Sequence, residues 1–221
     1  MTIKMPNQKK MYEYETFFHL TAGRDRITKF LKHYEFLKMA KNISGEIVEC
    51  GVFKGTSFLR LAHIRDILGL KKKLIGFDNF NDNYPNTDIS QDKNLRKKWI
   101  KNSGGKSISI NQLQKVLDQK KIKEYSLIKG DVESTIKNFI KKNPKLKICF
   151  LNIDIDFYES TLVCLKYLYP KLSKGGVLVL DNYEFGYGET KAIKNFLSVN
   201  KIKKSIFHCL DKKRPVCIIK K

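Results

Sequence analysis

The sequence predicts an α/β fold with a mostly parallel, seven-stranded sheet, helices on both faces and one antiparallel strand at the C-terminal end. Three observations predict it. Strand-like apolar runs alternate with segments of helical periodicity from residue 45 onward. The run "ICFLNI" (148–153) is almost wholly apolar, which is typical of a strand buried on both faces of a parallel sheet. The last two strand-like runs have no long helix between them, so they predict a terminal hairpin.

The predicted elements follow one another in a regular order along the chain. Apolar residues recur at helical spacing near the N-terminus, which predicts an N-terminal helical cap over residues 1–44. These residues are Ile27, Phe30, Leu31, Tyr34 and Leu37. Residues 45–221 form the main domain, whose predicted strands are Glu46–Glu49, Lys73–Phe77, Tyr125–Ile128, Leu146–Ile153, Gly176–Leu180, Ser205–Leu210 and Pro215–Ile219. Its predicted helices are Ser57–Leu68, Ile110–Gln119, Ser134–Lys142, Ser160–Leu172 and Glu189–Ser198.

The stretch from residue 79 to residue 109 interrupts this alternation. It is polar, it contains Asn, Asp, Pro and Gly together with Trp99, and it is predicted to be a long irregular insertion. Long irregular segments within compact α/β domains are usually binding loops or lids. We therefore expect residues 79–109 to form a lid over the functional site.

The chain is strongly basic, with a formal net charge of +22 over its 221 residues. Such a charge is typical of nucleic-acid-binding proteins. However, the cations are spread along the whole chain, and most are lysines rather than the arginines that read bases by bidentate hydrogen bonds. A solvated lysine surface is the favoured interpretation, so nucleic acid is not expected as a partner. The alternative is a polyanion site, and a phosphorylated small substrate would also be attracted to this surface.

The five cysteines are scattered, and no CxxC pair occurs. An odd, scattered set predicts reduced thiols in a cytoplasmic protein, rather than a disulfide framework or a zinc site. No apolar stretch reaches the ~18 residues that a membrane span requires, so no membrane partner is expected. The N-terminal residues lack the apolar segment of a signal peptide.

The segment "IVECGVFKGTS" (47–57) combines a strand, a glycine turn and the start of a helix. Gly51 permits a sharp bend and a close approach to a ligand, and Gly55 permits close packing where the helix begins. Thr56 and Ser57 are predicted to cap this helix, whose free N–H groups attract anions. The spacing Glu-x-Gly-x-x-x-Gly resembles the first motif of class I S-adenosylmethionine (SAM) methyltransferases; the alternative is a purely structural turn. The GxGxxG pattern of nicotinamide-dependent oxidoreductases is absent from this segment.

Three acidic residues follow or end three successive predicted strands, namely Glu49, Asp78 and Asp131. Ligands of open α/β sheets bind at the carboxyl ends of the strands. Asp78 is predicted to accept hydrogen bonds from the ribose hydroxyls of a nucleotide cofactor. The resemblance to class I SAM methyltransferases implies that Asp131 lies near the adenine amino group, because these proteins often have an acid at this position. Each acid taken alone is equally well a turn residue or a helix cap.

Two further acids and an amide follow the fourth and fifth predicted strands. Asp154 lies in "FLNIDIDFYEST" (150–161), and Asp181 with Asn182 follows "GGVLVL" (175–180). If these strands are neighbours, about 4.8 Å apart, the side chains form an oxygen-only cluster. Such a cluster suits Mg²⁺ and does not suit structural zinc. The alternative is that Asp181 caps a loop and that Asp154 is solvated.

These residues resemble the macrocin O-methyltransferase family, of the TylF and NovP type. The resemblance covers about residues 45–196 and is most specific in "IDIDFYESTLVCLKYLYPKLSKGGVLVLDNY" (153–183). It implies a Rossmann-like class I methyltransferase fold, SAM and Mg²⁺ as cofactors, and a sugar or nucleotide-sugar hydroxyl as acceptor. By motif position, Asp154 and Asp181 match metal ligands of the family and Asp156 matches its proposed base. Because members of the family commonly form dimers, a homodimer is a further possibility.

Two departures from the family pattern stand out. Asn182 replaces a second aspartate, although related magnesium-dependent methyltransferases have asparagine at this position. "GDVES" (130–134) replaces Gly-Trp-Phe after the third strand, which affects the predicted adenine pocket. The alternatives to a sugar O-methyltransferase are a nucleic-acid methyltransferase, suggested by the charge, and a non-catalytic SAM-binding protein.

Overall fold

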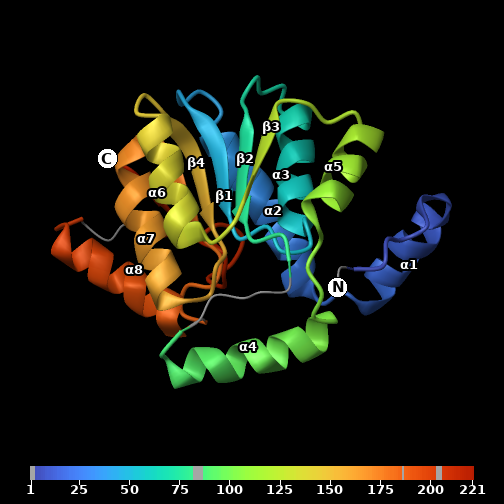
Figure 1. The fold of residues 1–221 in the computed structure, drawn as a ribbon. Coiled ribbons are helices and arrows are strands. Elements are labelled where there is room, and N and C mark those ends of the chain that lie inside the picture. Colours follow the sequence, from blue (N-terminus) through green and yellow to red (C-terminus); the bar gives the residue numbers. More distant parts are fainter. Residues whose placement is uncertain (1–2, 82–86, 186, 203–205) are drawn as a thin grey trace.

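The computed structural model describes residues 3–81, 87–185, 187–202 and 206–221 (Figure 1). These residues form a seven-stranded sheet between two layers of helices, with the strand order β3-β2-β1-β4-β5-β7-β6. The strands are β1 (Glu46–Cys50), β2 (Leu74–Asp78), β3 (Tyr125–Lys129), β4 (Ile148–Ile153), β5 (Leu172–Leu180), β6 (Ile206–Phe207) and β7 (Val216–Ile219). The pairs from β3 to β5 are parallel, whereas β7 runs antiparallel to both β5 and β6. The predicted fold class is confirmed.

The helices largely match the predicted segments. They are α1 (Met11–Thr21), α2 (Arg24–Met39), α3 (Thr56–Ile67), α4 (Ser90–Ser103), α5 (Ile110–Gln119), α6 (Val132–Lys142), α7 (Tyr158–Leu168) and α8 (Tyr187–Val199). Two short 3-10 helices are η1 (Gln8–Lys10) and η2 (Tyr169–Lys171). In Figure 1, α6, α7 and α8 cover one face of the sheet, and α2, α3 and α5 cover the other.

The two helical layers pack against opposite sides of the same strands, because successive side chains of a strand point to opposite faces. Val48 and Leu151 are fully buried in the core shared with α6, α7 and α8. Their neighbours Ile47 and Phe150 are fully buried in the core shared with α2, α3 and α5. Both faces of β1 and β4 are therefore covered, and their carboxyl ends are the parts of these strands that remain for a site.

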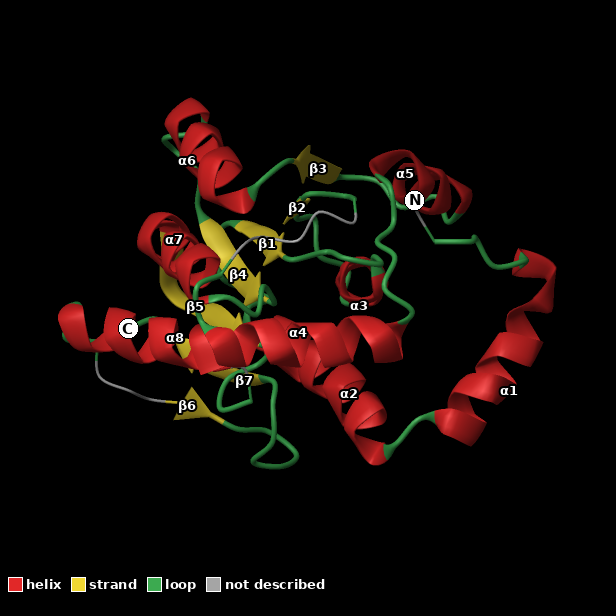
Figure 2. Ribbon diagram, turned by 60° about the horizontal axis from the view of Figure 1, so that its bottom comes forward, coloured by secondary structure: helices red, strands yellow, loops and turns green. Residues whose placement is uncertain are grey.

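Helix α2 supplies part of the second core. Phe36 and Leu37 are fully buried within it. Leu37 belongs to the predicted apolar set, whereas Phe30 and Leu31 of that set are each 46% exposed. Helix α1, by contrast, has no buried residue and extends away from the body of the molecule (Figures 1 and 2). The division into a cap over residues 1–44 and a main domain over residues 45–221 stays a prediction.

The segment predicted to be an irregular insertion contains a helix, and in this respect the prediction was wrong. Residues 82–86 lie outside the described residues, and Ser90–Ser103 form α4. Both ends of α4 are held by other parts of the chain. The carboxylate of Asp92 accepts a 2.9 Å hydrogen bond from the backbone N–H of Gly188, and Lys54 Nζ donates to the carbonyl of Ser103. Figure 2 shows α4 lying across one end of the sheet.

The predicted C-terminal hairpin is present, although β6 is shorter than the predicted strand Ser205–Leu210, whose first residue lies outside the described residues. Every helix in the described ranges is too short or too polar to span a bilayer. The five cysteines are free thiols. The cytoplasmic location inferred from them stays a prediction.

Candidate active site

The glycine turn after β1 packs directly on the loop after β4. Gly51 has a φ of 91°, and a Cβ atom built on it would lie 1.9 Å from the carbonyl oxygen of Asp154. No side chain fits in that space, so glycine is required for both its backbone conformation and its size. Asp154 in turn donates its N–H to the carbonyl of Cys50 at 2.9 Å. The predicted cofactor turn and the predicted catalytic loop are therefore in direct contact.

Helix α3 begins differently from the prediction. Gly55, with a φ of 80°, occupies the N-cap position, and no side chain caps the helix there. The expectation that Thr56 and Ser57 act as caps was wrong, because both lie within the first turn of α3. Gly55 instead permits close packing, since a Cβ atom on it would lie 2.9 Å from Leu113 Cδ1 in α5.

Glu49 is fully buried at the carboxyl end of β1. Its Oε1 accepts a 3.0 Å hydrogen bond from Asn152 Nδ2 on the neighbouring strand β4, and its Oε2 is buried with no hydrogen-bond partner in the described part of the chain. Burial raises the pKa of Glu49 to about 7, although the polar side chains of Ser57 and Asn152 oppose the shift. Glu49 therefore retains an acceptor oxygen beside the glycine turn.

Asp78, at the end of β2, holds the glycine turn from the other side. Its Oδ2 accepts hydrogen bonds from the backbone N–H groups of Val52 and Phe53, both at 2.8 Å, and its Oδ1 accepts one from Phe80 at 2.8 Å. Burial raises the pKa of Asp78, against the effect of these hydrogen bonds. The sequence did not predict this bracing role, and the predicted contact with ribose hydroxyls stays a prediction.

Asp131 is exposed and lies at the N-cap of α6, where its Oδ1 accepts from the N–H of Glu133 at 3.4 Å. This is the helix-cap role that the sequence left open as the alternative. Its predicted position near an adenine is not tested by the contacts in the structure.

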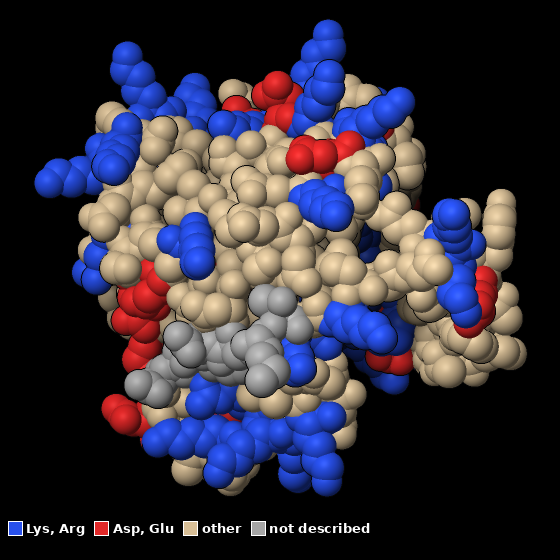
Figure 3. Space-filling view, turned by 45° about the vertical axis from the view of Figure 1, so that its right-hand side comes forward, with Lys and Arg blue, Asp and Glu red and all other residues tan. Residues whose placement is uncertain are grey.

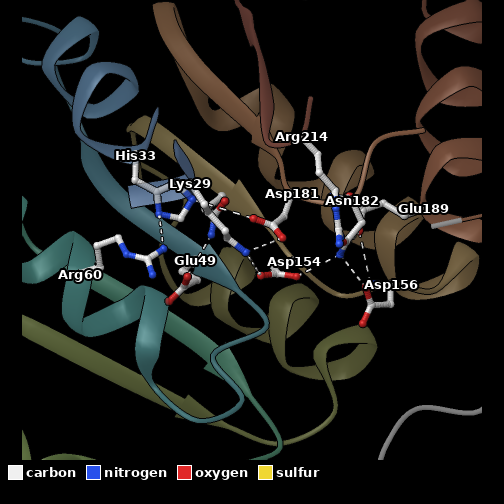
Figure 4. A network of polar contacts seen from close by, with 11 residues as sticks. Lys29, His33, Glu49, Arg60, Asp154, Asp156, Asp181, Asn182, Glu189 and Arg214 are labelled. Carbon is white, nitrogen blue, oxygen red and sulfur yellow. Dashed lines mark hydrogen bonds and ion pairs between the residues drawn. The ribbon is translucent and has the colours of Figure 1, made fainter. Parts of the chain in front are cut away.

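The carboxylates of Asp154 and Asp181 face the same cation, the ammonium group of Lys29 on α2 (Figure 4). Lys29 Nζ lies 2.7 Å from Asp181 Oδ2 and 3.6 Å from Asp154 Oδ2. Burial opposes the charge of both partners, but their attraction raises the pKa of Lys29 and lowers that of Asp181. Burial and the charge of Asp181 raise the pKa of Asp154 well above its usual range. The predicted convergence of the two carboxylates is thus present.

Asn182 joins the loops after β4 and β5. Its Nδ2 donates to Asp154 Oδ1 at 3.1 Å and to Asp156 Oδ1 at 2.6 Å. Its Oδ1 accepts from the guanidinium of Arg214. The amide oxygen of Asn182 therefore faces Arg214, and its nitrogen faces the aspartates (Figure 4).

Asp156 lies beyond the end of the fourth strand. β4 ends at Ile153, as predicted, and Asp156 adopts a left-handed conformation with a φ of 71°. Burial and the charge of Asp181 raise the pKa of Asp156 to about 6, although Arg214 opposes the shift. A carboxylate with such a pKa is suited to accept a proton near neutral pH.

Three residues of the cluster were missed by the sequence reasoning, namely Lys29, Glu189 and Arg214. Glu189 is fully buried, and its carboxyl group accepts the backbone N–H of Asn182 at 3.0 Å and that of Asp156 at 3.3 Å. Burial and the charge of Asp156 raise the pKa of Glu189 well above its usual range. Glu189 therefore ties together the two loops that carry the candidate catalytic groups.

His33 and Arg60 form the wall of the site behind Asp181. His33 Nε2 lies 3.9 Å from Asp181 Oδ1, and Arg60 Nη1 lies 3.4 Å from His33 Nδ1. Burial and the nearby charge of Lys29 lower the pKa of His33 to about 3, so its ring is neutral at physiological pH. Asp181 Oδ1 is buried without a hydrogen-bond partner in the ranges that the structure describes.

The donor set of Asp154, Asp181 and Asn182 fits magnesium in its chemistry, because it consists of oxygens only. The shared orientation of the two carboxylates and the unpaired Asp181 Oδ1 also fit a cation. The amide oxygen of Asn182 is turned toward Arg214, and Lys29 lies between the carboxylates. Among the described residues, no group of three or more His, Cys, Asp and Glu side chains is arranged to hold a metal ion.

Helix α4 lies over the glycine turn and the loop after β4. The ring of Trp99 packs on that of Phe53 with their centroids 4.5 Å apart, and the guanidinium of Arg96 lies 4.8 Å from the ring centroid of Phe157, the residue after Asp156. The helix is strongly basic, with Lys93, Arg96, Lys97, Lys98 and Lys101. Figure 3 shows Lys and Arg side chains gathered along the lower edge of the molecule, where α4 lies in Figure 1.

The model of the family described as Macrocin-O-methyltransferase (TylF) matches residues 8–213 of this chain. The chain belongs to the macrocin O-methyltransferase family. The resemblance inferred from the sequence motifs is thereby confirmed.

Two curated O-methyltransferases are similar in sequence to this chain, with slightly more than a fifth of the aligned residues identical. The chain is 23% identical over 174 residues to the demethyldecarbamoylnovobiocin O-methyltransferase of Streptomyces niveus, which covers 75% of this chain and 62% of that protein. It is 21% identical over 183 residues to the mycinamicin III 3''-O-methyltransferase of Micromonospora griseorubida, which covers 77% of this chain and 67% of the relative. The chain therefore spans less than two thirds of the Streptomyces relative.

Solved structures share the fold. The calicheamicin methyltransferase CalS11 superposes with a TM-score of 0.73 at 20% identity, covering 96% of this chain and 86% of that one. The O-methyltransferase NovP superposes with a TM-score of 0.71 at 20% identity, covering 90% of this chain and 80% of that one. The chain thus shares its Rossmann-like architecture with these two methyltransferases.

Proposed function

We propose that this protein is a SAM-dependent O-methyltransferase that methylates a hydroxyl group of a sugar, with a nucleotide-linked sugar as the acceptor. One observation carries the proposal. In a chain of this family, the carboxylates of Asp154, Asp156 and Asp181 converge beside a glycine turn that packs on the same loop. The arrangement supplies a cofactor site and a proton acceptor next to each other.

The cofactor would lie along the carboxyl ends of β1, β2 and β3. We assign its binding to seven residues, which are Glu49, Gly51, Gly55, Thr56, Ser57, Asp78 and Asp131. Glu49 Oε2 is a buried acceptor without a partner in the described chain, which suits the ammonium group of SAM. Asp78 holds the turn against β2, so that its backbone is in place before the cofactor binds.

Asp156 is assigned as the general base that takes the proton from the acceptor hydroxyl. Asn182 and Glu189 hold it in position through its side chain and its backbone N–H. Asp154, Asp181 and Asn182 would hold Mg²⁺, which when bound supplies Lewis acidity toward the acceptor oxygen. The attack of an alkoxide on a sulfonium cancels charge, so a site shielded from water favours it; α4 is placed to provide that shielding.

The acceptor class is inferred from the charge of α4. A helix with five cations in its fourteen residues lies over the site, and a basic surface attracts phosphorylated ligands. The diphosphate of a nucleotide-linked sugar matches this charge, whereas a neutral glycoside does not. A structure described as CalS11, TDP-rhamnose 3'-O-methyltransferase, shares the fold with a TM-score of 0.67 at 19% identity, which supports the same acceptor class for this chain.

A homodimer is part of the proposal. Helix α1 exposes large apolar side chains, with Tyr12 at 74%, Phe17 at 53% and Leu20 at 77% relative exposure, and such a surface is typical of an interaction site. Light scattering on the full chain tests this assignment, since a monomeric mass at micromolar concentration would contradict it.

Calorimetry and an acceptor screen test the function. SAM is expected to bind without a metal, and methyl transfer to a nucleotide sugar is expected to require Mg²⁺ and to stop in EDTA. Asp154→Asn is expected to keep SAM affinity and to abolish turnover. Turnover that persists in EDTA would remove the assigned metal. SAM binding with unchanged turnover in Asp154→Asn would favour a non-catalytic role for that residue.

Two rival functions have their own tests. A nucleic-acid methyltransferase would shift a random oligonucleotide in a gel and would lose that binding as salt increases. A non-catalytic SAM-binding protein would bind SAM and transfer its methyl group to no acceptor in the screen.

A further inference from the structure

Lys29 occupies the position between two carboxylates where a metal ion would be held. Its Nζ lies 2.7 Å from Asp181 Oδ2 and 3.6 Å from Asp154 Oδ2, and only 18% of its side chain is exposed. The sequence offered no sign of this contact, because Lys29 lies in the N-terminal region and the aspartates follow β4 and β5. The contact is therefore a property of how α2 is docked.

A second lysine fixes that docking. Lys32 is fully buried, its Nζ forms a 2.7 Å ion pair with Asp211 Oδ1, and it donates to the backbone carbonyls of Asp211 and Pro215 at 3.3 Å. It also donates to the carbonyl of Lys213. Residues three positions apart lie on the same face of a helix, so Lys32 holds α2 with Lys29 directed toward the aspartates.

We infer that Lys29 is a built-in competitor of the divalent cation, so that a metal ion binds the Asp154–Asp181 pair only when Lys29 withdraws. The inference rests on the metal site assigned in the proposed function. The side chain of Asp181 is 4% exposed and that of Asp154 is 24% exposed. Two carboxylates so close together and so little hydrated require a counter-charge, and the ammonium group supplies it. An ammonium and a divalent ion held by the same oxygens repel each other strongly at such a separation. The two cations therefore exclude one another.

The inference has a structural consequence for the N-terminal helices. Because Lys29 belongs to α2, occupation of the pair by a metal ion breaks one of the contacts between α2 and the catalytic loops. Metal affinity and the position of α2 are thereby linked. When α2 holds Lys29 against the carboxylates, the metal ion is excluded, and when the metal ion is bound, Lys29 is displaced.

The inference is tested by titrating the full chain with Mn²⁺ in the absence of SAM. Electron paramagnetic resonance of the free Mn²⁺ gives the affinity. Lys29→Met is expected to bind Mn²⁺ at least about tenfold more tightly than the wild type, because the competing charge is gone. Lys29→Arg keeps a cation and is expected to bind weakly, as the wild type does. Lys38→Met is the matched control, because Lys38 lies on the same helix with 54% of its side chain exposed.

Equal affinity in Lys29→Met and the wild type would overturn the inference, and so would the absence of Mn²⁺ binding in Lys29→Met. A second measurement uses the wild-type protein, so it does not depend on whether a variant folds. Saturating Mn²⁺ is expected to increase the labelling of Lys29 by an amine-reactive reagent several-fold, and unchanged labelling would contradict displacement. SAM binding and methyl transfer are measured in separate assays. If Lys29→Met binds Mn²⁺ more tightly but the wild type shows no methyl transfer, the proposed activity is rejected and the inference about Lys29 stands.

Discussion

Asn182 donates a 2.6 Å hydrogen bond from Nδ2 to Asp156 Oδ1, although the two residues lie in loops that follow different strands. The bond fixes the carboxylate of Asp156 beside the Asp154–Asp181 pair. It also leaves the second carboxylate oxygen of Asp156 for another proton donor. This is the geometry expected of a general base next to a cation site.

Replacing Asp156 tests that role. Asp156→Asn is expected to reduce kcat at least about a hundredfold, because an amide cannot take the hydroxyl proton. SAM affinity is expected to stay unchanged, because the hydrogen bonds that hold the glycine turn come from Asp78. Steady-state kinetics and SAM calorimetry measure the two effects, with exposed Asp118→Asn as the control. A variant that keeps its wild-type kcat would show that another group takes the proton.

Glu189 is expected to contribute to stability through two backbone N–H groups, of which that of Asn182 is buried and that of Asp156 is partly buried. Glu189→Ala leaves the N–H groups of Asn182 and Asp156 without their acceptor, which is expected to lower the free energy of unfolding by about 2–4 kcal/mol. Glu189→Gln keeps one acceptor oxygen and is expected to cost less than half as much. Urea denaturation measures both values. Equal stability of Ala, Gln and wild-type proteins would contradict the positioning role.

Glu49 is expected to make stability depend on pH. Its pKa is about 7 in the folded protein against an ordinary value of 4.5, so between these two pH values the folded state keeps a proton that the unfolded state has lost. The contribution of Glu49 to stability is therefore full below about pH 4.5 and declines as the pH rises to about 7, by about 3 kcal/mol.

Glu49→Gln has no proton to lose and checks this expectation. Its free energy of unfolding is expected to decline less than that of the wild type between about pH 5 and pH 7. Urea denaturation across this range gives both curves. Parallel curves for the two proteins would show that Glu49 does not titrate with a raised pKa.

Asp78 is expected to govern cofactor affinity through the glycine turn. Asp78→Asn replaces one carboxylate oxygen by an NH2 group that cannot accept, so either the N–H groups of Val52 and Phe53 or that of Phe80 lose their acceptor. The loss of hydrogen bonds to a charged group is expected to weaken SAM binding by about tenfold to a hundredfold. Calorimetry measures the change, and Asp66→Asn, a surface change on α3, is the control. If Asp78→Asn binds SAM as tightly as the wild type, the hydrogen bonds from Asp78 to the glycine turn do not contribute to cofactor affinity.

The sequence was sufficient for the sheet and for the convergence of Asp154 and Asp181. Parallel strands place their carboxyl ends at one edge, so neighbouring strands bring their following residues together whatever the loops do. Lys29 and Arg214 could not be predicted in this way, because their positions depend on the docking of α2 and of the loop before β7. Glu189 was expected at a helix start, but nothing in the pattern indicated that its carboxyl group turns inward.

Two local predictions failed for identifiable reasons. Gly55 takes the N-cap position by its left-handed backbone, which moves Thr56 and Ser57 into the helix. The polar sequence of α4 lacks the apolar stripe that reveals an amphipathic helix. Its ends are instead held by Asp92 and Lys54, and such tertiary contacts are not visible in local periodicity.

The contact between Gly51 and the carbonyl of Asp154 leaves no space even for a methyl group. The turn at Gly51 and the loop at Asp154 therefore behave as one mechanical unit, since a displacement of either segment pushes against the other. Substitutions in the outer segments, α4 and α1, leave this contact intact, so these segments are the parts of the molecule to redesign first.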